Sequence, residues 1–466
     1  MDEISFGTDG WRATLDTFTD RRVRIVGQAV ADTLAASEPD GSERQVIVGY
    51  DARPTSEGFA ESLAAVLAGN GFDVLLPERD CPTPLVAHAI VERDAAGAMM
   101  VTASHNPPEY NGVKFIPDDG APALPEVTER IEANLREPAL DAAGTDEEGE
   151  IRRVDLVTPH AEHARDLVAG DGALDLSGLT VAYDAMHGSG RGVTDALLEA
   201  AGAEVERLRC ERDPEFGGGS PEPSAENLTE LTERVAEGGA DLGIANDGDA
   251  DRLAIVTSER GHLDENLFFA ATYDHLLEGD SGPAIRTVST TFLIDRIAEA
   301  HGEEVVETAV GFKWVAEAMG EHDALMGGEE SGGFSVRGHV REKDGVLMAL
   351  LAAAAEREES YDNRVDRLEA EHGRIVADKV SVDCPDGEKA RVIDDLADHI
   401  PDEVAGEAVA DVVTVDGFKL LLADGSWLLV RPSGTEPKMR VYGESGSEAD
   451  TAAILADGRG LVEALV

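Results

Sequence analysis

Residues 98–114 read A-M-M-V-T-A-S-H-N-P-P-E-Y-N-G-V-K, a short apolar run followed by a polar turn. The run at 98–102 has the length and composition of a buried strand. It continues a series in which apolar strands alternate with helices, the strands at 45–50 and 72–76 and the helices near 59–67 and 84–93. Strands that alternate with helices predict an α/β fold, in which a mostly parallel sheet is covered by helices on both faces.

The polar turn after this strand carries a candidate nucleophile. Ser104 stands directly beside His105 and ten residues before Lys114. A serine hydroxyl held on a turn, next to groups that can move a proton, is typical of covalent catalysis. We therefore expect Ser104 to be catalytic.

The strand-and-helix pattern recurs along the chain. V-A-Y-D at 181–184 repeats the form of V-G-Y-D at 48–51, and a third unit begins with the run 284–289. Short strands between helices from about residue 374 onward predict a final α+β unit. A chain of 466 residues is too long for one core. We expect four domains around a cleft, at 1–148, 149–257, 258–372 and 373–466, with a polar linker at 137–150.

The composition limits the kinds of partner. The net charge is −56, from 95 acidic and 39 basic residues spread along the chain. Such a surface repels nucleic acid and anionic membranes. Molar salt shortens the Debye length to about 3 Å, from about 10 Å at 0.1 M, and so removes most of the self-repulsion. We therefore expect a halophilic protein of a salt-rich cytoplasm that binds small molecules.

The cysteines and the first residues of the sequence also indicate a cytoplasmic protein. Cys81, Cys210 and Cys384 are isolated, lack metal-site spacing and are expected to be reduced core thiols. The first residues hold no basic segment followed by an apolar run. No stretch approaches the roughly eighteen apolar residues of a membrane span. Secretion and membrane spanning are therefore not expected.

D-G-D-A-D-R at 247–252 lies between two apolar runs. Its carboxylates belong to Asp247, Asp249 and Asp251. Three carboxylates two residues apart can converge on one cation, and an all-oxygen set suits Mg²⁺. A calcium loop is excluded, because Ser258 stands where that loop needs glutamate. A solvated acidic turn is the other interpretation, but the apolar flanks and Arg252 favour a metal site.

G-G-E-E-S-G-G at 327–333 places Glu329 and Ser331 on a glycine-rich loop. A carboxylate can accept hydrogen bonds from two neighbouring sugar hydroxyls, and glycine lets a ligand approach the backbone closely. An ordinary connector explains the same residues, so the significance of this loop depends on the other motifs.

R-P-S-G-T-E-P at 431–437 follows an expected strand at 426–431. Its groups suited to phosphate belong to Arg431, Ser433, Gly434 and Thr435, and Arg440 adds charge. A guanidinium fork, two hydroxyls and a backbone amide can together hold a phosphate. A plain hairpin turn is the alternative interpretation.

Two further cations stand out by their position. Arg12 ends F-G-T-D-G-W-R at 6–12, and Lys313 lies in V-G-F-K-W at 310–314. The chain has only seven lysines, so a lysine at this place suggests a specific role. An ordinary chain start and a stray surface lysine are the plainer interpretations.

In their order and rough spacing, the five motifs at 6–12, 102–108, 247–252, 328–333 and 431–437 resemble the alpha-D-phosphohexomutase superfamily. The resemblance is to its phosphoglucomutase and phosphomannomutase members and runs nearly end to end. It implies four domains around a central cleft, three of them related α/β domains with mixed, mostly parallel sheets and the last an α+β domain. It also implies that each domain gives one loop to the active site.

The resemblance assigns roles around the reacting phosphate. Ser104 would be the phosphorylated serine, and a phosphoserine oxygen would join the magnesium ligands Asp247, Asp249 and Asp251. Charge would be neutralised by Arg12, Arg252 and Lys114. Lys114 is our candidate general base, and His105 would orient the phosphate or assist proton movement.

The remaining residues would hold the rest of the substrate. The sugar hydroxyls would bind Glu329 and Ser331. The phosphate that does not react would be held by Arg431, Ser433, Gly434 and Thr435, with Lys313 and Arg440 as further substrate-binding residues. The implied reaction interconverts a hexose 1-phosphate and a hexose 6-phosphate through a 1,6-bisphosphate, which would also serve as activator. The partners would be small hexose phosphates, and the protein would be a monomer or a homodimer.

Two positions bear on the substrate, and two other functions fit part of the pattern. Glu330 stands where the aminosugar branch usually carries glutamine, and Gly333 where mannose-type enzymes often carry histidine. These departures favour glucose, with mannose also open. A metal-dependent sugar-phosphate phosphatase would use the same aspartates, but Asp251 stands where such enzymes place a hydroxyl or β-branched residue. A sugar-phosphate-binding protein without catalysis is the third candidate, although the serine, aspartates and cations are all present.

Overall fold

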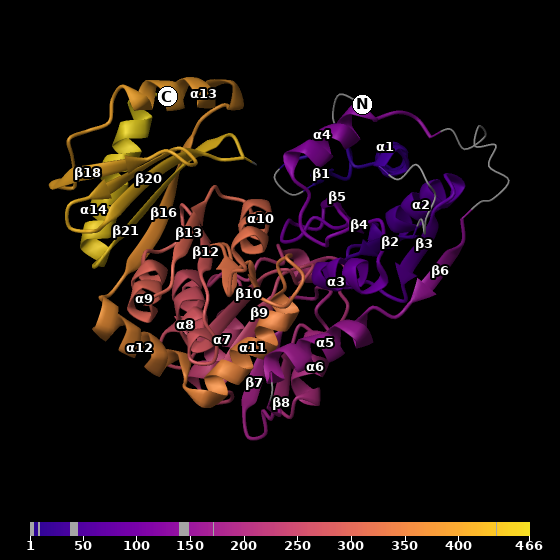
Figure 1. Ribbon diagram of the computed structural model, residues 1–466, viewed down its shortest axis with the longest axis horizontal. Coiled ribbons are helices and arrows are strands. Elements are labelled where there is room, and N and C mark those ends of the chain that lie inside the picture. The colour runs from indigo at the N-terminus through magenta and orange to yellow at the C-terminus, as the bar shows by residue number, and fades with distance from the viewer. Residues whose placement is uncertain (1–3, 8–9, 38–44, 139–148, 171, 435) are drawn as a thin grey trace.

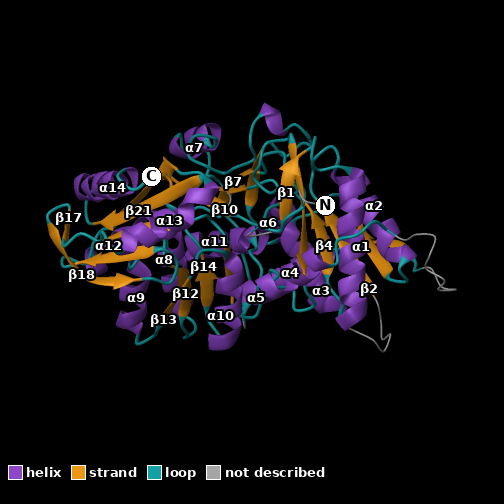
Figure 2. Ribbon diagram, turned by 90° about the horizontal axis from the view of Figure 1, so that it is seen from above, coloured by secondary structure: helices purple, strands orange, loops and turns teal. Residues whose placement is uncertain are grey.

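The structure is a computed structural model that describes residues 4–7, 10–37, 45–138, 149–170, 172–434 and 436–466. These residues form four β-sheets with helices packed against them (Figure 1). Seen from above, the β16–β21 sheet lies at one end of the molecule and the β1–β6 sheet at the other (Figure 2). Residues 139–148 of the expected linker lie outside the described ranges.

The first sheet has six strands in the order β1-β5-β4-β2-β3-β6. In chain order its elements are β1 (Trp11–Thr14), α1 (Asp20–Ser37), β2 (Gln45–Tyr50), α2 (Ser56–Gly69), β3 (Asp73–Pro77), α3 (Thr83–Arg93), β4 (Ala98–Val101), β5 (Tyr110–Ile116), α4 (Pro125–Ala133) and β6 (Ile151–Val154). Strand β2 is almost wholly buried because its two faces pack against different cores: Ile47 lies with Leu85 of α3, and Val46 with Leu63 of α2.

The second sheet has the order β11-β10-β9-β7-β8 and the third β13-β12-β14-β15. The second unit comprises α5 (Val157–Ala169), β7 (Thr180–Asp184), α6 (Thr194–Ala200), β8 (Glu204–Leu208), α7 (Thr229–Ala236), β9 (Leu242–Asn246), β10 (Leu253–Thr257) and β11 (Gly261–His262). The third comprises α8 (Glu265–Leu277), β12 (Ala284–Thr287), α9 (Leu293–His301), β13 (Val305–Thr308), α10 (Phe312–His322), β14 (Met326–Gly328), β15 (Phe334–Val336), α11 (Gly345–Glu358) and α12 (Tyr361–His372).

These three sheets share one connectivity. In β2–β5, in β7–β10 and in β12–β15, the first strand pairs in parallel with the second and third, and the third pairs antiparallel with the fourth. The V-G-Y-D and V-A-Y-D segments lie at the ends of the first strands, β2 and β7. The prediction of three related α/β units with mixed, mostly parallel sheets is confirmed.

The repeated connectivity positions the candidate site. Ser104 lies in the hairpin between the third and fourth strands of the first unit, β4 and β5. The aspartates lie in the equivalent β9–β10 hairpin, and Glu329 and Ser331 in the β14–β15 hairpin. One supersecondary position, used three times, therefore carries all three motifs.

Contacts across the units hold them together. Strand β6 follows the expected boundary at residue 148 yet pairs in parallel with β3 of the first sheet. Helix α11 follows the third sheet but packs against β9 and β10 of the second. One apolar core consequently contains Leu85 of α3, Ile244 of β9 and Leu347 of α11. The first three units are thus joined by a shared core as well as by the chain.

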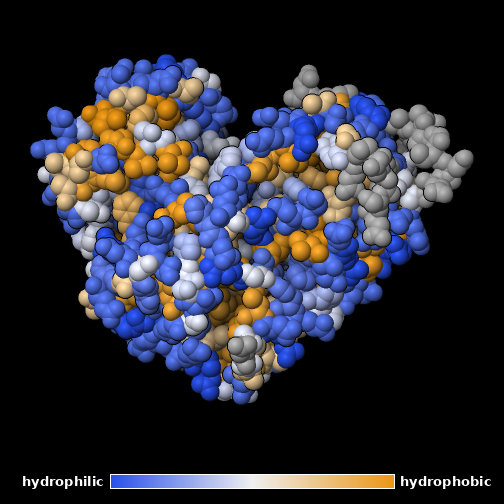
Figure 3. All heavy atoms as spheres, viewed as in Figure 1, coloured by the Kyte–Doolittle hydropathy of each residue, from blue (hydrophilic) through white to orange (hydrophobic). Residues whose placement is uncertain are grey.

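The last unit is an antiparallel sheet in the order β16-β21-β20-β19-β18-β17 with two helices. It comprises β16 (Val376–Asp383), α13 (Asp386–Ala397), β17 (Glu403–Val404), β18 (Glu407–Val413), β19 (Phe418–Leu422), β20 (Trp427–Pro432), β21 (Lys438–Ser445) and α14 (Glu448–Glu463). Trp427 and Leu429 pack against Val288 of the third unit. The surface is hollowed between this unit and the first (Figure 3). None of the described helices combines the length and apolar surface of a bilayer span.

Candidate active site

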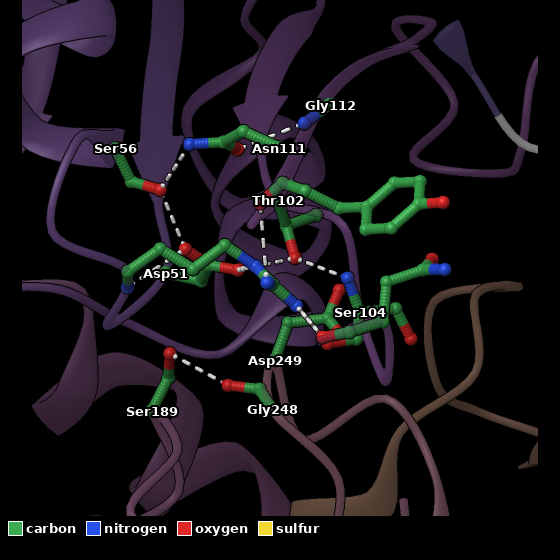
Figure 4. Close-up of polar contacts among 12 residues, drawn as sticks. Asp51, Ser56, Thr102, Ser104, Asn111, Gly112, Ser189, Gly248 and Asp249 are labelled. Atoms are coloured by element: carbon green, nitrogen blue, oxygen red, sulfur yellow. Dashed lines mark hydrogen bonds and ion pairs between the residues drawn. The ribbon is translucent and has the colours of Figure 1, made fainter. Parts of the chain in front are cut away.

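Ser104 is presented by a strained turn. Its φ is 49°, in the left-handed region that residues with a side chain seldom adopt. Such strain persists only where the surroundings fix the backbone, and it is concentrated at functional sites. Part of that fixation comes from Thr102, whose Oγ1 accepts a hydrogen bond from Ser104 N at 2.8 Å and donates to Asp51 Oδ2 at 2.8 Å (Figure 4).

Arg53 gives this turn further support, and sequence reasoning missed it. Its side chain is fully buried and pairs with Asp51 Oδ2 at 3.0 Å. The guanidinium donates to four backbone carbonyls of the turn, those of Ser104 (2.7 Å), Asn106 (2.7 Å), Pro107 (2.7 Å) and Tyr110 (3.2 Å). The available signal was an arginine two residues after the aspartate of V-G-Y-D.

The structure brings Ser104 and the aspartate triplet together. Ser104 Oγ donates to Asp247 Oδ2 at 2.6 Å. The two hairpins touch closely, since a Cβ on Gly248 would lie 2.6 Å from the Ser104 carbonyl oxygen, which only glycine avoids. Thr83, at the start of α3, locks the same loop from the first unit by donating Oγ1 to Asp249 Oδ2 at 2.6 Å.

The three aspartates fit a divalent cation. All three are fully buried, and one oxygen from each lies within 4.8 Å of the others. Burial and the neighbouring Asp249 and Asp251 carboxylates raise the pKa of Asp247 well above its ordinary value. Within the described residues, Asp249 Oδ1 accepts no hydrogen bond. Crowded carboxylates of this kind favour a bound cation, and oxygen-only ligands suit Mg²⁺.

Cationic side chains surround the triplet. Lys114 Nζ lies 3.3 Å from Asp251 Oδ2 and 3.7 Å from Asp249 Oδ2, and Arg252 Nε lies 4.0 Å from Asp251 Oδ1. Lys343 Nζ lies closer still, 2.9 Å from Asp251 Oδ2. Sequence reasoning missed Lys343, although the scarcity of lysine that singled out Lys313 applies equally to it.

His105 and Arg12 complete the surroundings of the serine. His105 Nδ1 lies 3.4 Å from Ser104 Oγ. The Arg252 guanidinium, burial and Arg12 lower the pKa of His105 to about 2, so this ring is a neutral imidazole at neutral pH. Arg12 Nη1 donates to Asn106 Oδ1, on the serine turn, at 3.4 Å.

The glutamate of the third hairpin is enclosed. Glu329 is 7% exposed, accepts a hydrogen bond from Gly311 N at 2.9 Å, and has its pKa raised to about 7 by burial and by Glu330. Ser331 is half-buried on the same hairpin. A Cβ on Gly333 would lie 2.4 Å from Lys343 Cδ. The stem of Lys343 thus fills the space that a larger residue at 333 would need.

The phosphate-loop residues lie in the fourth unit. Arg431 Nε pairs with Asp416 at 2.8 Å, and Arg440 donates to Ser381 Oγ at 2.6 Å and pairs with Glu436. Ser433 is buried and Gly434 exposed, whereas Thr435 lies outside the described residues. The described partners of the two arginines all belong to this unit.

Lys313 lies elsewhere, between the first and third units. Its Nζ stands over the Trp314 ring, 5.7 Å from the centroid. Lys313 also lines a cavity of about 420 Å³ together with Asp118 and Arg341. Its predicted role in substrate binding therefore remains a prediction.

Profiles of one protein family match most of the chain. Four phosphoglucomutase/phosphomannomutase family profiles match: alpha/beta/alpha domain I at 3–141, domain II at 161–261, domain III at 264–371 and the C-terminal domain at 380–459. The chain is 33% identical to a "Probable phosphoglucosamine mutase" of Methanothermobacter thermautotrophicus, covering 99% of this chain and 98% of the relative.

Two further proteins are similar to this chain over nearly its full length. The chain is 31% identical to a "Phosphoglucomutase/phosphomannomutase" of Thermococcus kodakarensis, covering 98% of each chain. The crystal structure of a "putative phosphomannomutase" from Thermus thermophilus superposes with a TM-score of 0.85, at 31% identity and with 99% of each chain covered.

Proposed function

The chain belongs to the phosphoglucomutase/phosphomannomutase family, and on that premise we propose that it moves a phosphoryl group between positions 1 and 6 of a hexose through Ser104. The observation that carries the proposal is the hydrogen bond of 2.6 Å from Ser104 Oγ to Asp247 in the buried triplet. A nucleophilic oxygen, a carboxylate set for a cation and three surrounding basic side chains are what phosphoryl transfer requires.

Asp247, Asp249 and Asp251 would hold Mg²⁺, with an oxygen of the phosphorylated Ser104 as a further ligand. When bound, this ion supplies positive charge against the transferring phosphoryl group. Lys114, Lys343 and Arg252 supply further positive charge from the protein itself, in a buried setting where it is strong.

The reaction starts from phosphorylated Ser104. The free 6-hydroxyl of a hexose 1-phosphate attacks the phosphorus, the bond to Ser104 Oγ breaks, and the hydroxyl proton passes to a base. Ser104 Oγ takes up a proton as it leaves, and the resulting 1,6-bisphosphate turns over. Ser104 Oγ then loses that proton and attacks the phosphorus at position 1, the bond from this phosphorus to sugar O1 breaks, and O1 takes up the proton, which leaves hexose 6-phosphate and phosphorylated Ser104. The neutral His105, beside the Ser104 oxygen, and Lys114, beside Asp251, are the candidates to move the proton. A 1,6-bisphosphate supplied from outside would restore enzyme that has lost its phosphoryl group.

Glu329 and Ser331 would hold the sugar hydroxyls, because the third hairpin occupies the position equivalent to the two reacting hairpins. The phosphate that does not react would be held by Arg431, Ser433, Gly434, Thr435 and Arg440 of the fourth unit, with Lys313 as a further cation. The surface is hollowed between the fourth and first units (Figure 3), and a phosphorylated sugar would enter there.

Glucose is the favoured sugar in this proposal. Glu330 stands where the aminosugar branch carries glutamine, and its Oε2 accepts a hydrogen bond from Ser289 Oγ at 2.7 Å. At position 333, the stem of Lys343 occupies the space of the histidine that mannose-type enzymes often carry. Glucosamine is the second candidate, because a relative with 33% identity carries that name.

A substrate panel tests both the reaction and the sugar. The 1-phosphates of glucose, mannose, glucosamine and ribose would be incubated with the protein, Mg²⁺ and a trace of glucose 1,6-bisphosphate in molar KCl. We expect glucose 6-phosphate without free phosphate. Steady phosphate release would indicate a phosphatase instead, and turnover of glucosamine or ribose 1-phosphate alone would reject the preference for glucose.

A further inference from the structure

Four of the chain's 12 histidines meet where the first three units join. His88 belongs to α3, His160 and His163 to α5, and His339 to the segment between β15 and α11. The ring centroids of His88 and His163 are 4.8 Å apart, those of His163 and His339 5.2 Å, and those of His160 and His339 5.7 Å. None of the four belongs to the proposed phosphoryl-transfer site.

Asp344 lies at the centre of this histidine cluster. Its Oδ2 lies 2.6 Å from His160 Nε2 and 2.8 Å from His339 Nε2. Its Oδ1 caps α11 by accepting hydrogen bonds from the backbone N–H groups of Val346 and Leu347 at 2.8 and 2.7 Å, which fixes the carboxylate. The side chains of His160, His339 and Asp344 are at most 1% exposed.

We propose that His160 Nε2, His339 Nε2 and Asp344 Oδ2 form a second metal site, specific for a transition-metal ion such as Zn²⁺ or Co²⁺. One ring nitrogen from each histidine and one Asp344 oxygen lie within 4.8 Å of one another, as a shared ion requires. Two imidazoles and one carboxylate suit such ions, whereas the all-oxygen aspartate triplet suits Mg²⁺. The two sites would therefore select different metals.

The ring nitrogens can accommodate the ion without net loss of a proton. With the hydrogen bonds to Asp344 in place, His160 and His339 carry their protons on Nε2, so binding through Nε2 requires each proton to be on Nδ1 instead. His160 Nδ1 has no hydrogen-bond partner among the described residues and can take it. His339 Nδ1 lies 3.1 Å from His163 Nε2, so that hydrogen bond reverses and the His163 proton moves to its own Nδ1.

The reversed hydrogen bond would also position the ligand. Metal-bound histidines generally donate their second ring N–H to a fixed acceptor, which holds the ring and increases its basicity. His163 would be that acceptor for His339. His163 is therefore a positioning residue of the proposed site. His88, whose ring is stacked parallel to that of His339 at a centroid distance of 6.2 Å, closes the cluster on the side of the first unit.

A cavity lies beside the histidine cluster. His88, His163 and His339 line a cavity of about 440 Å³, together with Glu92 and Asp323. The wall also holds Asp119, Arg337 and Arg341, and the two arginines pair with Asp323 and Asp119. A metal site needs an entry path, and this cavity is where such a path would begin.

The proposed site is linked to the aspartate triplet through the start of α11. Asp344 follows Lys343, whose Nζ lies 2.9 Å from Asp251, and Gly345 N donates to the Ala250 carbonyl at 3.2 Å. An ion shared by His160, His339 and Asp344 would hold this segment, which contacts the loop of the triplet, to α5 of the second unit. The expected role is to hold the units together at the site.

Cobalt titration of the full chain tests the proposal. The protein would first be stripped with chelator and then saturated with Mg²⁺ in molar KCl, so that the triplet and the acidic surface are occupied. We expect one equivalent of Co²⁺ to bind with the visible absorption of an imidazole ligand set and to raise Tm. His160→Gln and His339→Gln should each weaken Co²⁺ binding by more than the roughly 10–100-fold typical of outer-shell changes.

His322→Gln is the matched control, because His322 is exposed at the end of α10, and it should bind Co²⁺ like the wild type. X-ray absorption of the Zn²⁺-loaded wild type is independent of how the variants fold, and two imidazole ligands are expected. The proposal would be overturned by a Zn²⁺ spectrum with oxygen ligands only or by no Co²⁺ binding above the Mg²⁺ background. It would also be overturned if His160→Gln and His339→Gln bound Co²⁺ as tightly as the wild type. Sugar-phosphate turnover plays no part in these readouts, so the second site and the proposed function can fail separately.

Discussion

The Ser104 hydroxyl donates to Asp247 across 2.6 Å, although 143 residues separate the two in the chain. Each lies in the hairpin between the third and fourth strands of its own α/β unit. A repeated unit thus places the nucleophile and the cation ligands in equivalent loops, and packing of the units brings the loops together. The close contact of Gly248 with the Ser104 carbonyl shows how tightly this arrangement is fitted.

Arg53→Lys should slow turnover and destabilise the protein. Lysine keeps a charge beside Asp51 but cannot donate to four carbonyls at once. Each buried carbonyl left without a donor costs about 1–3 kcal/mol, and the left-handed turn at Ser104 loses its main support. If one or two such losses also raise the activation barrier, by about 1.4–2.8 kcal/mol, kcat should fall by roughly 10–100-fold. The Tm should fall as well.

The check is steady-state kinetics and thermal unfolding of this variant beside Arg130→Lys. Arg130 is an exposed arginine of α4, so its replacement should leave both quantities unchanged. A wild-type kcat for Arg53→Lys would mean that the serine turn holds its geometry without the guanidinium.

Lys343→Met should tighten Mg²⁺ binding while lowering kcat. The ammonium lies 2.9 Å from Asp251 and competes with a cation for the same carboxylate. Charges at this separation interact by several kcal/mol even at an effective dielectric constant of about 20. Calorimetric titration with Mg²⁺ should show roughly tenfold higher affinity, allowing for relaxation of the site. Lys379→Met, at an exposed lysine of β16, is the control. Unchanged or weaker Mg²⁺ binding by Lys343→Met would contradict this account.

The sequence allowed the site residues to be predicted where they are neighbours in the chain. The serine turn and the aspartate triplet are recognisable because each motif stands within a few residues. Arg53 and Lys343 were missed because their partners are remote: Arg53 acts on carbonyls at least 51 residues away, and Lys343 on an aspartate 92 residues earlier. No local pattern encodes such contacts.

The fold, too, was predictable where local composition determines it and not where contacts between remote segments do. The strand at 45–50 was predicted at its observed bounds, because its apolar composition directly reflects burial on both faces. The pairing of β6 with β3 and the packing of α11 on the second sheet could not be foreseen, since they depend on tertiary contacts between units. The histidine cluster likewise arises from three separate segments.

Stability should rise with salt. The chain carries a net charge of −56, and screening weakens the repulsion between its carboxylates. Raising KCl from about 0.1 M to about 1 M shortens the Debye length from about 10 Å to about 3 Å. Calorimetry should therefore show a Tm that increases over this range, by at least several degrees for a charge of this size. A Tm that is flat or falls with KCl would argue against adaptation to a salt-rich cytoplasm.

Glu356 should make stability depend on pH. Burial raises its pKa from 4.5 to about 7 in the folded protein, where it accepts a hydrogen bond from Tyr361 N at 2.8 Å. Between these two values the folded state binds more protons than the unfolded chain. The contribution of the Glu356 carboxyl to the free energy of unfolding is therefore fully present below about pH 4.5 and is lost as the pH rises to about 7.

Glu356→Gln should accordingly remove part of the decline in the free energy of unfolding between about pH 4.5 and 7. Denaturant unfolding at several pH values, in constant KCl, measures the slope for both proteins. Glu321→Gln, at an exposed position of α10, should keep the wild-type slope. Identical slopes for Glu356→Gln and the wild type would show that this carboxyl does not titrate as described.

The central claim is that Ser104 carries the phosphoryl group, and intact mass combined with turnover tests it most directly. Wild-type protein and Ser177→Ala, an exposed control, would be incubated with glucose 1,6-bisphosphate and Mg²⁺ beside Ser104→Ala. The account predicts a gain of one phosphoryl group in the first two, none in Ser104→Ala, and a loss of mutase turnover of at least roughly 10⁴-fold in that variant. A Ser104→Ala protein that still takes up the phosphoryl group, or still interconverts the sugar phosphates, would contradict it.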